Sequence, residues 1–203
     1  MTGCADITGV LLVGGKSRRM GRDKAFLKIG GVPLYERMLR VLEDNFDAVI
    51  LVGDSDDRFI CHLPIYPDIH PGSALGGLFT GIQRATTDRI FVAPCDIPFP
   101  SAPLVRYLCA ASEGNDVTVP LTANGLEPLF AVYRKSCLPP MKTLLKARDF
   151  RIRMFYPAVK VRYVGVDEIS LHDPNGTAFV NLNTPAEYER AATNGRLIPH
   201  TSC

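Results

Sequence analysis

One segment near the beginning of the chain joins an apolar run to a glycine pair and a basic loop: Gly9-Val10-Leu11-Leu12-Val13-Gly14-Gly15-Lys16-Ser17-Arg18-Arg19-Met20-Gly21-Arg22-Asp23-Lys24. The apolar run predicts a buried strand that ends at the glycines. The nine residues after the glycine pair carry five cations and one acid. Glycines let backbone N–H groups approach an oxyanion closely. The loop therefore predicts a ligand with several negative charges, and a nucleoside triphosphate is the simplest candidate.

Two other interpretations fit parts of this segment. A strand followed by two glycines and scattered basic residues is often a solvated turn, but five cations are denser than such a turn requires. Gly15-Lys16-Ser17 also resembles the end of a P-loop, whose pattern G-x-x-x-x-G-K-[ST] would need a glycine at position 10. That position is Val10, and Gly9 is one residue too early. The spacing excludes a P-loop.

Length and composition predict a single α/β domain over residues 1–203, with flexible ends at 1–6 and 196–203. The 203 residues are 46% hydrophobic and 22% charged, which is ordinary for a globular protein. A net charge of +2 argues against broad nucleic-acid binding. No apolar run is long enough to cross a bilayer. The six cysteines are dispersed and show no metal-ligand spacing, which favours free thiols and a cytoplasmic location.

Short apolar runs alternate with amphipathic stretches, a pattern typical of a mainly parallel sheet flanked by helices. We expect strands at 7–13, 48–53, 89–94, 116–121, 127–133 and 160–166, a short strand at 178–182 and a weaker candidate at 63–65. We expect helices at 34–45, 75–86, 101–112, 137–147 and 185–193. Ser101 is the expected N-cap of the third helix.

Two carboxylates follow predicted strands, where ligands bind in open α/β sheets. Asp96 comes directly after an apolar run, and the choice of Ser101 as N-cap leaves its carboxylate available. Magnesium takes one or two carboxylates together with phosphate oxygens and waters, so Asp96 is a candidate metal ligand. Asp68 lies in a turn-rich segment with His70 and Gly72, which fits either a structural turn or a loop that approaches a ligand. His70 has no evident catalytic partner in the sequence.

A third candidate is the segment Asn181-Leu182-Asn183-Thr184-Pro185-Ala186-Glu187. Thr184, Pro185 and Glu187 are explained by a capping box at a helix start. Asn181 and Asn183 are not, and two amides two residues apart share one face of an extended chain. Such a pair is suited to binding a polar heterocycle or phosphate oxygens.

The basic segment Leu12-Val13-Gly14-Gly15-Lys16-Ser17-Arg18-Arg19-Met20-Gly21-Arg22-Asp23-Lys24 closely resembles the signature of molybdenum cofactor guanylyltransferases of the MobA type. Further similarities lie in Pro67-Asp68 through Gly72, Leu75-Gly76-Gly77-Leu78, Pro94-Cys95-Asp96-Ile97-Pro98-Phe99, Glu127-Pro128-Leu129 and Asn181-Leu182-Asn183-Thr184-Pro185. They span roughly residues 8–192. The resemblance implies a three-layer Rossmann-like nucleotidyltransferase fold.

The resemblance also implies transfer of GMP from Mg–GTP to molybdenum-bound molybdopterin, with release of pyrophosphate. By similarity, the residues that contact GTP would be Leu12, Val13, Gly14, Gly15, Lys24, Asp68 and Asp96, with Asp96 holding Mg2+. The residues on the side of the pterin or of the reacting phosphates would be Arg19, Gly21, Gly72, Gly77, Asn181 and Asn183. Arg19, Lys24 and Asp96 would take part in catalysis.

Two positions depart from the family pattern. Val13 replaces the usual alanine, and Gly53 stands where some relatives have an asparagine that helps to recognise guanine. Two alternatives stay open: a cytidylyl- or sugar-nucleotide transferase on the same fold, and a nucleotide-binding protein that delivers the cofactor without turnover. Protein partners implied by the resemblance are other cofactor-biosynthesis proteins or the molybdoenzymes that receive the product.

Overall fold

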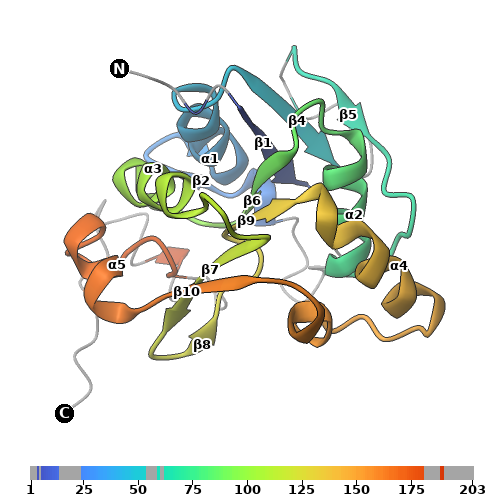
Figure 1. Cartoon of the computed structure of the whole chain (residues 1–203). Coiled ribbons are helices and arrows are strands. Elements are labelled where there is room, and N and C mark those ends of the chain that lie inside the picture. The colour runs from blue at the N-terminus through green and yellow to red at the C-terminus, as the bar shows by residue number, and fades with distance from the viewer. Residues whose placement is uncertain are drawn as a thin grey trace.

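The computed structural model of the chain describes residues 4, 6–13, 24–53, 59, 62–180 and 188–189, and for Lys24 only the backbone. Its centre is a mixed sheet (Figure 1). Along the sheet the strands follow the order β10 (Val161–Val164), β7 (Val117–Thr122), β9 (Ala131–Arg134), β6 (Arg89–Pro94), β1 (Ile7–Leu12), β4 (Ala48–Val52) and β5 (Ile65–Tyr66). The short strand β8 (Gly125–Leu126) pairs with β7. Neighbouring strands from β6 to β5 are parallel, whereas β9 is antiparallel to both β6 and β7.

Helices cover both faces of this sheet and make three layers (Figure 1). The core on one face contains residues of α1 (Leu34–Glu43), α3 (Ala102–Ala111) and α5 (Val166–His172). The core on the other face contains residues of α2 (Ala74–Arg84), α4 (Leu138–Lys146) and the 3-10 segment η4 (Ile152–Ala158). Along β1, Leu11 packs into the first core, and Val10 and Leu12 pack into the second. This alternation follows from the two-residue period of a strand with helices on both sides.

Serine side chains begin two of the helices. Ser101 accepts a hydrogen bond from Leu104 N at 3.3 Å, so the predicted N-cap of α3 is confirmed. Ser73 caps α2 in the same way, accepting from Gly76 N at 3.0 Å. In both cases the serine hydroxyl satisfies a backbone N–H that has no partner within the helix.

Asp116 joins three segments at the amino ends of β7 and β10. One carboxylate oxygen accepts a hydrogen bond from Ser136 Oγ at 2.6 Å, and the other accepts from Lys160 N at 2.8 Å. Ser136 belongs to the 3-10 segment η3 (Lys135–Cys137), and Lys160 directly precedes β10. The Ser136 and Lys160 hydrogen bonds hold the pKa of Asp116 below its ordinary value of 3.8.

A second polar group lies at the same edge of the sheet. Arg89 is nearly buried at the start of β6 and forms ion pairs with Asp6 and Glu113. Beside it the half-buried Cys4 thiol is hydrogen-bonded to Cys109 on α3. This hydrogen bond lowers the pKa of Cys4 to about 7. Arg89 therefore ties the N-terminal segment to the sheet far from the carboxyl ends of β1 and β6.

Most of the predicted elements are confirmed, with two corrections in the described residues. Residues 178–180 form a turn and an irregular link, so a strand over that range is wrong. The strand expected at 127–133 begins only at Ala131, because Phe130 N closes a turn onto Glu127 O at 3.0 Å. Of the helix expected at 185–193, residues 188–189 are helical and the others lie outside the described residues, as does the capping box at 184–187.

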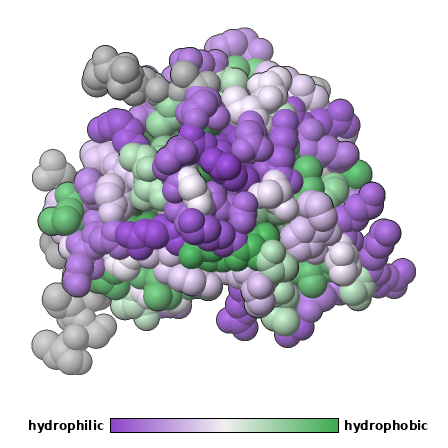
Figure 2. Space-filling model, viewed as in Figure 1, coloured by the Kyte–Doolittle hydropathy of each residue, from purple (hydrophilic) through white to green (hydrophobic). Residues whose placement is uncertain are grey.

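Several elements were not predicted, and each is short or lacks a clear apolar period. They are α5, β8, the 3-10 segments η2 (Lys24–Phe26), η3 and η4, and the hairpin formed by β2 (Lys28–Ile29) and β3 (Val32–Pro33). None of the helices in the described ranges is both long and apolar enough to span a bilayer. Figure 2 shows hydrophilic residues over much of one face, with hydrophobic residues gathered in patches between them.

Candidate active site

The strand order places a crevice at the carboxyl ends of β1 and β6. From β1 the chain proceeds outward through β4 to β5, and then returns through α2 to form β6 on the other side of β1. Ligands of open α/β sheets bind where the order of strands reverses in this way. Leu12 is in register with Val52 of β4 and with Pro94 of β6, so the end of β1 is held between two parallel neighbours.

Of the segment from Leu12 to Lys24, the structure describes Leu12, Val13 and the backbone of Lys24. Leu12 and Val13 are buried, and Val13 N donates to Val52 O at 2.9 Å, which extends the pairing one residue beyond the strand. The candidate residues Gly14, Gly15, Arg19 and Gly21 lie outside the described residues, and so do Asn181 and Asn183. Lys24 begins η2, and its side chain is not described.

Asp68 follows β5 and is held by its own loop and by α2. Its Oδ1 accepts a hydrogen bond from His70 N at 2.8 Å and another from Thr80 Oγ1 at 3.0 Å. Thr80 Oγ1 in turn accepts from Ile69 N at 3.0 Å. His70 is exposed, and its ring packs edge-on against the ring of Phe79, with 5.5 Å between the ring centroids. The loop is therefore structured by the same carboxylate that the sequence predicts as a nucleotide contact.

Gly77 brings Asp68 and β1 together. A Cβ at this glycine would lie 3.5 Å from Leu12 Cδ2 and 3.9 Å from Asp68 Oδ2. Three predicted site residues, Leu12, Asp68 and Gly77, thus meet at one place although 65 positions separate the first from the last. Gly72 lies in the same loop with a φ of 97°, in the left-handed region that favours glycine.

The preceding glycine has a different role. A Cβ at Gly76 would lie 2.0 Å from the carbonyl oxygen of His70, closer than any side chain can approach. Gly76 therefore lets the 67–72 loop rest directly on the first turn of α2. This contact fixes the position of the loop that carries Asp68.

Asp96 lies in the turn directly after β6, on the opposite side of β1 from Asp68. Its side chain is partly exposed, and within the described ranges no hydrogen bond or ion pair joins its carboxylate to another residue. The next turn is fixed by Arg37 of α1, whose Nη1 donates to Pro98 O at 3.5 Å and whose Nη2 donates to Ile29 O at 2.5 Å. Asp96 is thus an available carboxylate on a supported loop.

No group of three or more His, Cys, Asp or Glu side chains in the described part of the chain is arranged to hold a metal ion. The single carboxylate of Asp96 offers what a phosphate-bound magnesium ion needs from a protein, namely an accessible hard oxygen ligand. The residue present therefore fits a metal that is held mainly by substrate phosphates.

Glu127 is a further carboxyl group near the end of β7, in a turn between β8 and β9. Partial burial raises its pKa above the ordinary value of 4.5, while a hydrogen bond with Thr122 acts in the opposite direction. Glu127 lies in the segment Glu127-Pro128-Leu129, which resembles the family, but the resemblance implies no role for it. Thr80, by contrast, resembled an ordinary core position of a helix, and no signal in the sequence marked its contact with Asp68.

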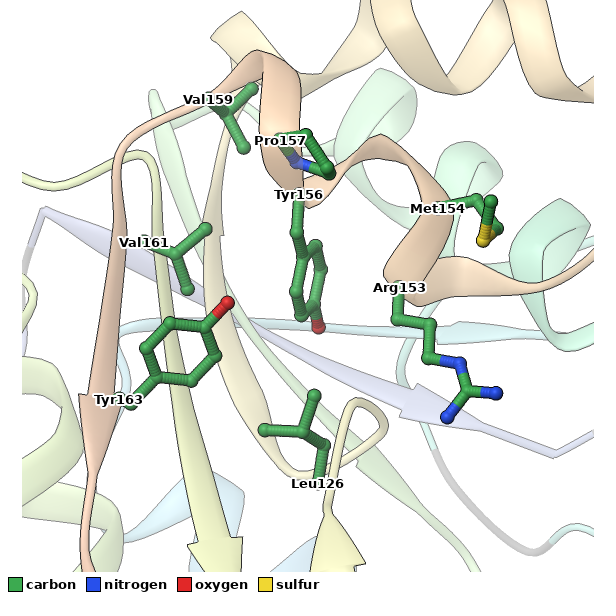
Figure 3. Close-up of a pocket in the computed structure, with 8 residues that line it drawn as sticks. All are labelled: Leu126, Arg153, Met154, Tyr156, Pro157, Val159, Val161 and Tyr163. Atoms are coloured by element: carbon green, nitrogen blue, oxygen red, sulfur yellow. The ribbon is translucent and has the colours of Figure 1, made fainter.

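A separate pocket of about 560 Å³ lies between β8, η4 and β10 (Figure 3). It is open and mainly apolar, and Tyr156, Tyr163 and Arg153 are among its lining residues. The Tyr156 hydroxyl is hydrogen-bonded to the buried Tyr133 hydroxyl at 2.9 Å. None of the predicted site residues with described side chains lines this pocket.

The α/β fold and the match to a family model together place this chain in the nucleotidyltransferase class. The sequence model of the "MobA-like NTP transferase domain" matches residues 9–160. The chain belongs to this family.

The similarity to individual relatives extends over nearly the whole chain. A protein of Pelotomaculum thermopropionicum named "Probable molybdenum cofactor guanylyltransferase" is 38% identical and covers 91% of each chain. The "Molybdenum cofactor guanylyltransferase" of Vibrio atlanticus is 31% identical over 91% of this chain and 94% of its own. The crystal structure of molybdopterin-guanine dinucleotide biosynthesis protein A from Archaeoglobus fulgidus has a TM-score of 0.80 at 22% identity. It covers 92% of this chain and 97% of its own, and it supports the fold.

Proposed function

We propose that this chain transfers GMP from Mg–GTP to the terminal phosphate of molybdenum-bound molybdopterin, forming the guanine dinucleotide cofactor and releasing pyrophosphate. The observation that carries this proposal is the crevice at β1, with Asp96 on one side and Asp68 on the other. The basic glycine loop leaves β1 at this point in the sequence. Relatives that match the chain over nine tenths of its length are named for this activity.

The reaction requires two anions to meet. An oxygen of the pterin phosphate attacks the α-phosphorus of GTP in line, the new P–O bond forms, and the bond from the α-phosphorus to the bridging oxygen breaks. Pyrophosphate leaves with that oxygen. Since no covalent intermediate on the protein is needed, the chain contributes positioning and charge neutralisation.

We assign roles by position. Leu12, Val13, Gly14 and Gly15 would lie against the nucleotide, and Asp68 would accept hydrogen bonds from it. Arg19 and Lys24 would neutralise the transferred phosphate and the departing pyrophosphate.

The second substrate would bind beside the nucleotide in the same crevice. Gly21, Gly72, Gly77, Asn181 and Asn183 would line the side of the pterin or of the reacting phosphates. We place the reaction in the cytoplasm, where thiols stay reduced. Proteins of cofactor biosynthesis or recipient molybdoenzymes would be its protein partners.

Asp96 would hold Mg2+ through its carboxylate. The metal ion, when bound, supplies positive charge to the phosphate oxygens. Within the described residues, the Asp96 carboxylate has no hydrogen bond or ion pair that metal binding would have to break. Arg37 supports its loop through the hydrogen bond to Pro98 O. Asp96 is therefore free to bind without rearrangement of the fold.

The test is to incubate the protein with Mg–GTP and molybdopterin cofactor, follow pyrophosphate release and identify the attached nucleotide by mass spectrometry. We expect Asp96→Ala to lower turnover by about 100-fold or more with an unchanged melting temperature, because loss of a metal contact removes several kcal/mol of transition-state stabilisation. Asp47→Ala is the matched control, since Asp47 is exposed before β4 at the opposite edge of the sheet. Near-normal metal-dependent turnover in Asp96→Ala would contradict the metal assignment.

The same assay separates the alternatives. A cytidylyl- or sugar-nucleotide transferase would use CTP or UTP in preference to GTP. A cofactor-delivery protein would bind nucleotide without releasing pyrophosphate.

A further inference from the structure

Thr80 is a fully buried polar residue in α2 whose hydroxyl is used twice. It accepts a hydrogen bond from Ile69 N and donates one to Asp68 Oδ1, each at 3.0 Å. The direction of the second bond follows from chemistry, because an ionised carboxylate can only accept. One hydroxyl thus connects the middle of α2 to the backbone and the side chain of the loop after β5.

The two oxygens of Asp68 have different surroundings. Oδ1 is occupied by His70 N and by Thr80 Oγ1. Oδ2 lies toward Gly77, 3.9 Å from the place where a Cβ of that residue would be, and Leu12 Cδ2 lies 3.5 Å from the same place. The oxygen that Thr80 does not engage therefore lies beside Gly77, which also borders Leu12 at the end of β1.

We propose that Thr80 is a positioning residue that orients the Asp68 carboxylate so that Oδ2 faces the nucleotide and accepts a hydrogen bond from an N–H or O–H group of the nucleoside. This inference rests on the proposed function, which places GTP at the end of β1. Phosphate oxygens carry no hydrogen to donate, so the partner of Oδ2 belongs to the base or the ribose. Without the Thr80 hydroxyl, only His70 N would hold Oδ1, and the carboxylate could turn away from this orientation.

A purely structural role for Thr80 makes a different prediction. If the hydroxyl only holds the 67–72 loop on α2, its removal lowers the stability of the protein without a specific effect on GTP. If it orients Asp68, its removal weakens GTP binding, and the effect disappears when the carboxylate is absent. The two roles are therefore separated by ligand affinity and by a double-mutant cycle.

The first experiment compares Thr80→Val, which keeps the shape and loses the hydroxyl, with Thr80→Ser, which keeps the hydroxyl. Thr118→Val is the control, because Thr118 is also fully buried and its hydroxyl has no hydrogen-bond partner in the described part of the chain. We expect Thr80→Val to raise the Kd for GTP about tenfold, and Thr80→Ser and Thr118→Val to stay within about twofold. Should Thr80→Val fail to fold, Thr80→Ala measured against Thr80→Ser gives the same contrast.

The second experiment combines Thr80→Val with Asp68→Ala. We expect the double variant to bind GTP as weakly as Asp68→Ala alone, because Thr80 acts through the carboxylate. Additive effects would overturn the positioning role, as would a wild-type Kd for Thr80→Val. A wild-type Kd for Asp68→Ala would also overturn it, while product formation by the unmodified protein would leave the proposed function standing. If the unmodified protein binds GTP but forms no guanylylated product, the proposed function fails and the Kd values still decide the role of Thr80.

Discussion

Gly76 and Gly77 are adjacent in the first turn of α2, yet alanine should have opposite effects at the two positions. At Gly76 the new methyl group would lie 2.0 Å from His70 O and 2.9 Å from His70 C. Backbone atoms cannot turn aside as a flexible side chain can, so the 67–72 loop must move by more than 1 Å to restore ordinary contact at about 3.4 Å. At Gly77 the methyl group would meet Leu12 Cδ2 at 3.5 Å, which is already ordinary contact.

The magnitudes follow from these contacts. Overpacking costs about 1–3 kcal/mol, each lost hydrogen bond of the Asp68 loop about 1 kcal/mol, and the better helix propensity of alanine returns about 1 kcal/mol. With two loop hydrogen bonds lost, we expect Gly76→Ala to lower the free energy of unfolding by about 2–4 kcal/mol. Gly77→Ala loses no contact, so its stability should be unchanged or higher by up to about 1 kcal/mol. Its methyl group nevertheless enters the space between Leu12 and Asp68.

Urea unfolding followed by circular dichroism gives the stability of both variants, and calorimetry gives their affinity for GTP. Gly76→Ala should unfold at a lower urea concentration. Gly77→Ala should keep or slightly exceed the wild-type midpoint, while its affinity for GTP and its turnover fall. Equal stability of Gly76→Ala and the wild type would refute the steric argument. A Gly77→Ala variant with full activity would show that this space is not used by substrate.

Three other substitutions or modifications test separate parts of the structure. Asp116→Asn should lower the free energy of unfolding by about 1–3 kcal/mol at pH 7. Because folding lowers the pKa of Asp116, this contribution should be lost as the pH falls below the ordinary 3.8, which urea titrations at pH 7 and pH 3 would detect. Iodoacetamide should label Cys4 with a half-maximal rate near pH 7, because its pKa is lowered to about 7. Cys137 should stay unlabelled, because burial raises its pKa to about 12. Peptide mass spectrometry measures the labelling of each cysteine, and equal labelling of the two would contradict this prediction. Lys24→Ala should weaken GTP binding more than guanosine binding by calorimetry, and equal losses would exclude a phosphate contact.

The sequence predicted the strands of the parallel part of the sheet because burial on both faces leaves a clear pattern. Residues 7–12, 48–52 and 89–94 are apolar runs bounded by turn residues, and all three became strands. The helix beginning after Ser101 was predicted because its N-cap is local chemistry. In each case the signal lies within the element itself.

Elements stabilised by distant contacts were missed or misplaced. In α5 only Ile169 is buried within seven residues, and the helix start depends on Glu168, whose carboxylate accepts from Gly165 N at 3.2 Å. One buried residue gives no helical period, so no pattern could predict this helix. The antiparallel direction of β9 also follows from its pairing with β6 and β7, and it leaves no trace in an apolar run.

The candidate site shows the same division between local and distant information. Asp68 and Asp96 were predicted because each follows a strand, but nothing in their order along the chain says that they lie on opposite sides of β1. That arrangement is made by α2, which packs against β4, β1 and β6 as it carries the chain from β5 across to β6.

The same helix supplies Gly76, Gly77 and Thr80, which contact the Asp68 loop or the end of β1. A crossover helix on a parallel sheet must pass close to the strand it crosses, and here that passage brings its first two turns against the predicted nucleotide contacts. The inner face of α2 therefore serves two purposes at once. Substitutions there should separate into those that mainly displace the loop, as at Gly76, and those that alter GTP binding, as at Gly77 and Thr80.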